Sequence, residues 1–177
     1  MITRKFATSI DSETDSELTI ASYYPIPGSG ELDMLEPLQR LQEIESRLKI
    51  CLPVVYEKAS PLKFHSYTKG DTLVPSLASA KLLEPQMLPE TLTSELPHFM
   101  LVPLLAFDPV RLTRLGYGGG YYDRTLQAMQ NHKESKVSCV TIGIAMECLK
   151  CENLEVDAHD QTLDFIVTEE ALYRQNS

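Results

Sequence analysis

The sequence has 177 residues, of which 43% are hydrophobic and 23% are charged, and its formal net charge is −9 at pH 7. This length suits one domain with a sizeable core, the acidic charge argues against nucleic acid as a partner, and no apolar run reaches the roughly 20 residues that span a bilayer. We therefore expect a cytoplasmic protein with one folded domain over residues 18–177, preceded by an acidic, flexible segment over residues 1–17.

The N-terminal half predicts a strand, a helix and two further strands. The run LTIASYY, residues 18–24, is rich in β-branched and aromatic residues and predicts a strand that ends at the following proline. Asp33 and Glu36 have the spacing of a capping box. Apolar residues then recur at helical spacing at Leu38, Leu41, Ile44 and Leu48. Buried strands are predicted at residues 50–56 and 61–67.

The C-terminal half begins with a proline-rich stretch, residues 72–98, which favours loops and short turns. The elements predicted after it are a central strand at 99–107, a loop at 108–120, a helix that begins at 121 and ends near Asn131, strands at 137–145 and 163–168, and a final helix at 169–175. Strands that are apolar on both faces and alternate with helices predict an α/β fold. We expect a single-domain three-layer sandwich whose mainly parallel sheet is flanked by helices.

The stretch RLGYGGGYYD, residues 114–123, contains four of the eight glycines and directly precedes a predicted helix. Glycines accept positive φ and allow close approach, so the N–H groups of this glycine loop (residues 114–120) can converge on one point. The positive end of the helix and the side chains of Arg111 and Arg114 also attract anions. The loop predicts a phosphate site, with a tight surface turn that only leads into the helix as the alternative.

Asp123 falls in the first turn of the predicted helix, beside the predicted phosphate site. It can simply complement the helix dipole, an effect worth about 0.3–1 kcal/mol. A carboxylate beside phosphates repels them unless a divalent cation lies between, so the loop and Asp123 together predict Mg²⁺ with a nucleotide phosphate. Of Tyr121 and Tyr122, we expect one to pack beneath the loop and the other to face the ligand.

Cysteines and histidines are not predicted to carry chemistry. No signal points to an oxidising compartment, so the four cysteines are expected to be reduced thiols. Cys148 and Cys151 have the C-x-x-C spacing, but no second pair stands at zinc spacing. The four histidines are scattered along the sequence, and we interpret each as a surface or packing residue.

The run MLVPLLAFDPVRLTRLGYGGGYYDRTL resembles the signature of the 5-formyltetrahydrofolate cyclo-ligases, also called methenyltetrahydrofolate synthetases. Shorter stretches are similar to other parts of that family, namely YYPIPGSGELD, PLKFHSY, LLEP and HDQTLDFIVTE. The resemblance covers about residues 18–169. It implies an enzyme that uses ATP and Mg²⁺ to cyclise a small molecule, 5-formyltetrahydrofolate, to 5,10-methenyltetrahydrofolate.

The resemblance also implies roles for single residues. The implied ATP-binding residues are Arg114, Leu115, Gly116, Tyr117, Gly118, Gly119, Gly120, Tyr121 and Tyr122. The folate is implied to contact Ile26, Glu31, Tyr117, Gly118, Gly119, Gly120 and Tyr121, with Glu31 accepting hydrogen bonds from the pterin N–H groups. The implied metal ligands are Asp123 and Asp160, and the implied catalytic residues are Arg114, Tyr121 and Asp123. Tyr67 stands where the family commonly has tryptophan and is implied to keep an aromatic wall.

The implied mechanism relies on positioning and charge neutralisation. The formyl oxygen attacks the γ-phosphoryl group of ATP, after which N10 attacks the activated carbon and phosphate leaves. Family members usually begin with a basic helix, whereas only Arg4 and Lys5 precede the first predicted strand here. A weakly active or inactive folate- or nucleotide-binding protein therefore stays an alternative, as does a sugar-phosphate or acyl-transfer enzyme. We expect a monomer that binds neither nucleic acid nor membranes.

Overall fold

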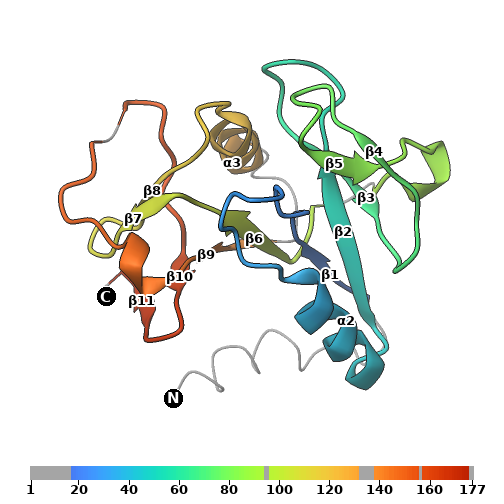
Figure 1. The fold of residues 1–177 in the computed structure, drawn as a ribbon, viewed down its shortest axis with the longest axis horizontal. Helices are drawn as coiled ribbons and strands as arrows, with labels where there is room; N and C mark the ends of the chain where they lie inside the picture. The colour runs from blue at the N-terminus through green and yellow to red at the C-terminus, as the bar shows by residue number, and fades with distance from the viewer. Residues whose placement is uncertain (1–16, 94–95, 132–137, 156, 176–177) are drawn as a thin grey trace.

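Figure 1 shows the computed structural model of the chain, which describes residues 17–93, 96–131, 138–155 and 157–175. A seven-stranded sheet has the order β11-β10-β9-β6-β1-β2-β3. Neighbouring strands from β10 to β2 pair in parallel, and the two edge strands pair antiparallel. The predicted mainly parallel sheet is therefore confirmed. The acidic segment predicted over residues 1–17 lies outside the described residues, except for Glu17.

The parallel part of the sheet consists of β1 (Leu18–Ala21), β2 (Leu48–Val54), β6 (Phe99–Pro103), β9 (Val140–Ile144) and β10 (Phe165–Val167). The edge strands are β3 (Lys63–Ser66) and β11 (Leu172–Arg174). Two separate antiparallel pairs are β4 (Leu73–Pro75) with β5 (Leu83–Pro85), and β7 (Ala106–Asp108) with β8 (Thr113–Leu115). The helices are α2 (Leu35–Ile44) and α3 (Tyr121–Asn131), with 3-10 turns η1 (Pro89–Thr91) and η2 (Glu147–Leu149).

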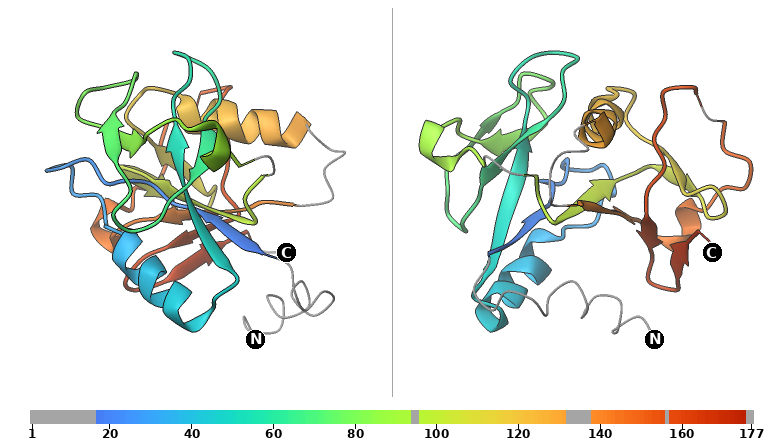
Figure 2. Two further views of the ribbon diagram at one scale, coloured as in Figure 1. Left: turned by 90° about the vertical axis from the view of Figure 1, so that its right-hand side faces the viewer. Right: turned by 180° about the vertical axis from the view of Figure 1, so that it is seen from behind.

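Side chains that alternate along the strands divide the core into two layers. On one face of the sheet, Met100 of β6 packs in a cluster with Leu126 of α3, which we call the α3 core. On the other face, the next residue, Leu101, packs in a cluster with Leu35 and Leu38, which we call the α2 core. Figure 2 shows the two helices on opposite sides of the sheet. The three-layer α/β sandwich is confirmed. Within the described residues, neither helix has the length and apolar character that a bilayer crossing needs.

The chain leaves the centre of the sheet in two opposite directions. From β1 it continues to β2 and β3 on one side, whereas from β6 it continues to β9 and β10 on the other. The strands β1 and β6 are parallel neighbours, so the strand order reverses between them. In open α/β sheets, ligands bind at the carboxyl ends of the strands at such a switch point. The topology therefore marks the region that follows Ala21 and Pro103.

The α2 helix begins and ends differently from the prediction. Met34 occupies the N-cap position, and Glu36 pairs with Arg40 at 2.6 Å instead of completing a capping box. Asp33 still helps the helix start, since its carboxylate accepts the N–H of Leu35 at 2.8 Å. The helix ends at Ile44, and Leu48 is the first residue of β2, with its side chain buried in the α2 core. Leu48 has the spacing of the preceding helical residues, but it is buried as the first residue of a strand.

Other boundaries differ because tertiary pairing overrides local pattern. The predicted helix at 169–175 is wrong, because residues 172–174 form β11 against β10. The predicted loop at 108–120 contains β8, which pairs with β7. The single strand predicted at 99–107 is divided into β6 and β7.

Candidate active site

A cavity of about 570 Å³ lies at the carboxyl ends of β1, β2 and β6, where the strand order reverses. This volume falls within the range of small-molecule sites. One wall is the glycine loop with the first turn of α3, and a second is the end of β2 with residues 76–84 of the β4–β5 pair. The remaining lining in the described part of the chain comes from the segment that follows β1, from Leu62 and Pro103, and from three acidic residues, Glu155, Asp157 and Asp160. Figure 1 shows α3 and the β4–β5 pair at the top of the view.

The glycine loop leaves its main chain open to the cavity. The φ angles are +78° at Gly118 and +63° at Gly120, a region that residues with a Cβ rarely adopt. A Cβ placed on Gly116 or Gly118 would meet no atom within 4 Å, so space is free beside both residues. Tyr117 is 50% exposed and lines the cavity. Gly116 and Gly118 are thus not covered by side chains, as anion binding by loop N–H groups requires, whereas a Cβ on Gly119 would lie 2.9 Å from the ring of Tyr121.

Arg124 of α3 holds the glycine loop from outside the cavity lining. Its Nη2 donates a hydrogen bond of 2.7 Å to the carbonyl of Gly119, and its guanidinium lies 4.9 Å from the ring centre of Tyr121. A Cβ on Gly120 would approach Arg124 Nη1 to 2.6 Å. Arg124 therefore restrains both the loop and the first aromatic residue of the helix. The sequence pattern did not single it out, although an arginine in the first helical turn can reach the preceding backbone.

Arg114 is buried behind the loop and is joined to Asp123. Its Nη2 donates to Asp123 Oδ1 at 2.9 Å, its Nη1 donates to the carbonyl of Gln161 at 2.8 Å, and its side chain is 5% exposed. The N–H of Gln161 donates to the same Asp123 oxygen at 3.1 Å. The other oxygen, Oδ2, has no hydrogen-bond partner among the described residues. Asp123 is thereby fixed by one oxygen while the other stays available to a ligand.

Asp160 lies beside Asp123 in the same cavity lining. It directly precedes Gln161, which bonds to Asp123, and its Oδ2 accepts the N–H of Asp157 at 2.9 Å. No group of three or more potential ligand side chains in the described part of the chain could hold a metal by itself. Two carboxylates nevertheless fit Mg²⁺, which commonly takes one or two carboxylates and completes its shell with phosphate oxygens and water.

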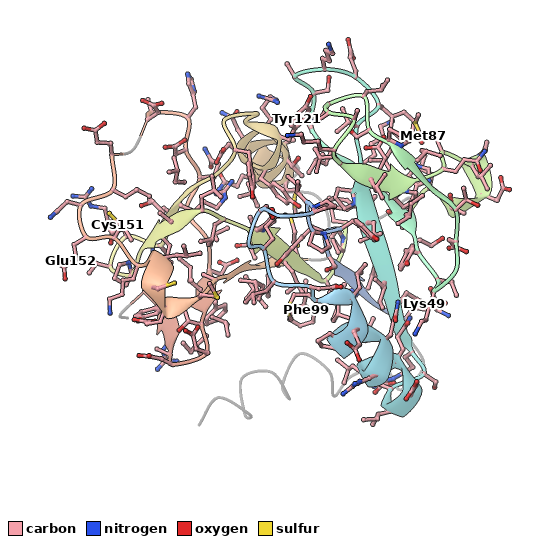
Figure 3. The ribbon with its side chains drawn as sticks, in the orientation of Figure 1. Lys49, Met87, Phe99, Tyr121, Cys151 and Glu152 are labelled. Atoms are coloured by element: carbon pink, nitrogen blue, oxygen red, sulfur yellow. The ribbon has the colours of Figure 1, made fainter. Side chains whose placement is uncertain are left out.

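The tyrosines around the cavity have different surroundings. Tyr122 packs against the α3 core, and Tyr121 stands at the start of α3 (Figure 3). Burial, followed by the nearby Glu31 carboxylate, raises the pKa of Tyr23, whose hydroxyl donates to the carbonyl of Leu32 at 2.8 Å. Burial likewise raises the pKa of Tyr122, with smaller contributions from Tyr23 and Glu31. Both hydroxyls therefore stay protonated at neutral pH and can donate hydrogen bonds.

Ile26 and Glu31, which the resemblance paired in a substrate loop, are in direct contact. Glu31 Oε2 accepts the N–H of Ile26 at 2.6 Å and the hydroxyl of Ser29 at 3.1 Å, and both Ile26 and Glu31 line the cavity. One oxygen of Glu31 therefore shapes its own loop, with Gly28 and Gly30 at positive φ on the same turn.

Two predicted residues lie apart from the cavity lining. Tyr67 is buried in the α2 core and is absent from the cavity lining, whereas Tyr23 and Tyr24 line the cavity. Arg111 is exposed, lies 3.9 Å from Asp108 Oδ2 and is absent from the cavity lining, so its attraction of anions to the site stays a prediction. The sequence signal that could have placed Tyr23 and Tyr24 at the site is that two consecutive tyrosines stand near the end of the first strand.

Acidic residues outnumber basic ones in the cavity. Among the described residues that line it, Arg114 is the one arginine or lysine, and the carboxylates are Glu31, Glu84, Asp123, Glu155, Asp157 and Asp160. A polyanion would be repelled by this lining without a bridging cation. Glu84, Glu155 and Asp157 were not expected at the site. Only the glutamate-proline pair in LLEP carried a signal for any of the three.

The sequence and the fold are similar to those of known proteins. The chain matches the 5-formyltetrahydrofolate cyclo-ligase family over residues 1–169. It is 35% identical over 141 residues to a 5-formyltetrahydrofolate cyclo-ligase of Escherichia coli K12, covering 78% of this chain and 72% of that protein. A probable 5-formyltetrahydrofolate cyclo-ligase of Schizosaccharomyces pombe is 37% identical over 82 residues, which are 44% of this chain and 40% of that protein.

Two solved structures share the fold. A 5,10-methenyltetrahydrofolate synthetase of Aquifex aeolicus superimposes with a TM-score of 0.60 at 26% identity, covering 99% of this chain and 82% of the other. A 5,10-methenyltetrahydrofolate synthetase of Mycoplasma pneumoniae gives a TM-score of 0.57 at 24% identity over 96% of this chain and 83% of that chain. The second likeness supports the fold alone.

Proposed function

Since this chain belongs to the 5-formyltetrahydrofolate cyclo-ligase family and is an enzyme with that family's activity, we propose that it converts 5-formyltetrahydrofolate to 5,10-methenyltetrahydrofolate with ATP and Mg²⁺. ADP and phosphate are released. The proposed enzyme acts as a monomer on a small molecule in the cytoplasm, where its four free thiols would be stable.

One observation supports the nucleotide and metal above all others. The glycine loop, the start of α3 and the carboxylates of Asp123 and Asp160 line a single cavity at the switch point of a parallel sheet. Helix N-termini and loop N–H groups attract phosphates, whereas carboxylates attract a divalent cation. A nucleotide carrying Mg²⁺ combines both chemistries, and a single phosphate without a cation does not.

In the proposed reaction, the formyl oxygen attacks the γ-phosphoryl group and ADP leaves. N10 then attacks the activated formyl carbon, loses its proton, and the oxygen departs with phosphate. The chain positions these groups: residues 114–122 bind the phosphates, Ile26 and Glu31 contact the folate, and residues 117–121 contact both. Asp123 and Asp160 would hold Mg²⁺, which neutralises phosphate charge when bound.

The test is formation of the methenyl product, followed by absorbance, from 5-formyltetrahydrofolate, ATP and Mg²⁺. Asp123→Asn keeps an oxygen that accepts from Arg114 and Gln161 but removes the negative charge. We expect it to lower kcat/KM by about a hundredfold or more, because the charge that holds the cation is lost.

Asp71→Asn is the matched control. Its carboxylate also accepts a backbone N–H, that of Thr68 at 2.7 Å, but it is exposed and lies outside the cavity lining. Its rate should equal that of the wild-type protein. Equal rates for Asp123→Asn would remove Asp123 from the metal site. Wild-type protein that binds ligand without forming product would instead favour the folate- or nucleotide-binding alternative.

A further inference from the structure

Glu84 is a buried carboxylate that neither the fold nor the proposed reaction explains. It lies in the middle of β5, opposite Val74 of β4, and is 4% exposed. Its side chain contributes to the wall of the cavity formed by the end of β2 and residues 76–84. A carboxylate removed from water is costly unless hydrogen bonds or an opposite charge compensate it. Its partners therefore decide what it does.

Within the described residues, Glu84 has one hydrogen bond and no ion pair. The N–H of Val55 donates to its Oε2 at 3.2 Å. The other oxygen, Oε1, accepts no hydrogen bond from the described part of the chain. Because Glu84 lines the cavity, we infer that this acceptor serves a ligand bound there.

Other roles for Glu84 fit less well. Anchoring β5 to β2 needs only one uncharged acceptor for the N–H of Val55, which a glutamine would also provide. Phosphate binding is excluded by charge repulsion, and the phosphate-binding features lie on the other wall, around Arg114 and the glycine loop. No group of three metal-ligating side chains forms among the described residues. The role that fits Glu84 best is to accept hydrogen bonds from a ligand with N–H donors.

We propose that Glu84 recognises the pterin ring by accepting hydrogen bonds from its 2-amino group and the adjacent N3–H. This inference rests on the proposed function, which supplies the substrate. Two neighbouring N–H donors on a flat ring match the spacing of a carboxylate. Glu31 is less suited to this role, because its Oε2 already accepts two hydrogen bonds from its own loop.

The surroundings of Glu84 match a ring of this kind. The cavity lining near it in sequence and along β2 is apolar and contains Leu82, Leu83, Pro53 and Val55. Apolar walls with a few placed polar groups are typical of sites for flat heterocycles. With the pterin held there, the formyl group can face the glycine loop across the cavity.

The first arm of the test measures the Kd of 5-formyltetrahydrofolate without ATP, for wild-type protein and Glu84→Gln. The variant keeps an oxygen for the N–H of Val55 but directs an amide N–H₂ towards ligand donors. We expect binding to weaken by about tenfold to a hundredfold, as for loss of a hydrogen bond to a charged group. Glu90→Gln, an exposed change in η1 outside the cavity lining, should leave Kd unchanged.

The second arm uses wild-type protein alone, so it holds even if the variant folds poorly. The 2-desamino-2-methyl analogue of 5-formyltetrahydrofolate lacks the amino donor. It should bind about tenfold or more weakly than the natural ligand, and Glu84→Gln should lose this preference. Equal affinity of wild-type protein for both ligands, or an unchanged Kd in Glu84→Gln, overturns the inference. Failure of the proposed function is distinct: the wild-type protein would then form no methenyl product from 5-formyltetrahydrofolate, ATP and Mg²⁺, whatever the Kd values of the two ligands are.

Discussion

Gly120 shows how single residues set the shape of the glycine loop. Its φ of +63° is unfavourable for any residue with a Cβ, and a Cβ there would lie 2.6 Å from Arg124 Nη1. Gly116 has neither constraint, since no atom lies within 4 Å of its Cβ position and its φ is not positive. A side chain would therefore be costly at Gly120 but not at Gly116.

Gly120→Ala should lower the free energy of unfolding by about 1–2 kcal/mol, because an L-residue is strained in the left-handed region. Moving Arg124 aside to make room would also lose its bond to Gly119. Chemical denaturation of Gly120→Ala and Gly116→Ala measures the difference. If Gly116→Ala lowered the free energy of unfolding as much as Gly120→Ala, the explanation by backbone strain would be contradicted.

Arg124→Gln should raise the KM for ATP by a few-fold to about tenfold and change kcat less. The variant would lose the hydrogen bond from Arg124 Nη2 to the loop and the contact between Arg124 and Tyr121. The loop would then become ordered only when the nucleotide binds, and this ordering would cost binding free energy. Arg40→Gln, an exposed arginine on α2, is the control and should leave both constants unchanged. A fall in kcat with an unchanged KM would mean that Arg124 acts in the chemical step instead.

At the scale of elements, a buried histidine joins β3 to the segment that follows β5. His65 is fully buried, with Nδ1 2.7 Å from Thr91 Oγ1 and Nε2 2.7 Å from the hydroxyl of Tyr56. Thr91 Oγ1 donates to the carbonyl of Leu88 at 2.9 Å, so it accepts from His65 Nδ1, and Nε2 accepts from Tyr56. The neutral ring thus satisfies both contacts.

Burial, followed by the nearby Lys63 charge, lowers the pKa of His65 below its usual 6.5. The unfolded chain therefore binds a proton at a higher pH than the folded chain does. The stabilisation is present above about pH 6.5 and is lost as the pH falls towards the folded-state pKa. The thermal unfolding midpoint should fall more between pH 7.5 and pH 5 for the wild-type protein than for His65→Gln. If the midpoints of both proteins fell by the same amount, His65 would not contribute to the pH dependence of stability.

At the scale of the whole molecule, the cavity depends on both directions in which the chain leaves the sheet. One wall follows β2 and the other follows β6, and the switch point between β1 and β6 brings them together. Ligands that contact both walls bind only the folded protein, so they raise the unfolding temperature. Because the lining is acidic, we expect stabilisation by a nucleotide to depend on a cation.

ATP with Mg²⁺ should therefore raise the thermal midpoint by several degrees, and ATP with a chelator should raise it by much less. The six carboxylates of the lining repel a nucleotide whose charge is not neutralised. Differential scanning calorimetry with Mg²⁺ alone as the control measures both shifts. Equal shifts with and without Mg²⁺ would contradict a bridging role for the cation.

Local patterns in the sequence predicted the sheet, α3 and the glycine loop, because each depends on residues close together in the chain. Apolar runs mark β6 and β9, and the glycine-rich stretch before an amphipathic helix marks the loop. Patterns failed where a distant partner decided the outcome. Tyr173 lies in β11 because β10 offers an edge for pairing, although a helix was predicted at this position.

The sequence by itself determined the α/β class, the glycine-rich loop before α3 at residues 114–123 and the resemblance to a family of known activity. Only the tertiary structure decided which distant residues share the cavity. Asp160, Asp123 and Glu84 line the same cavity, and Arg111 lies beside Asp108 outside that lining. The physical reason is that periodicity and turn chemistry act over a few residues, whereas contacts between residues far apart in sequence depend on strand order and packing.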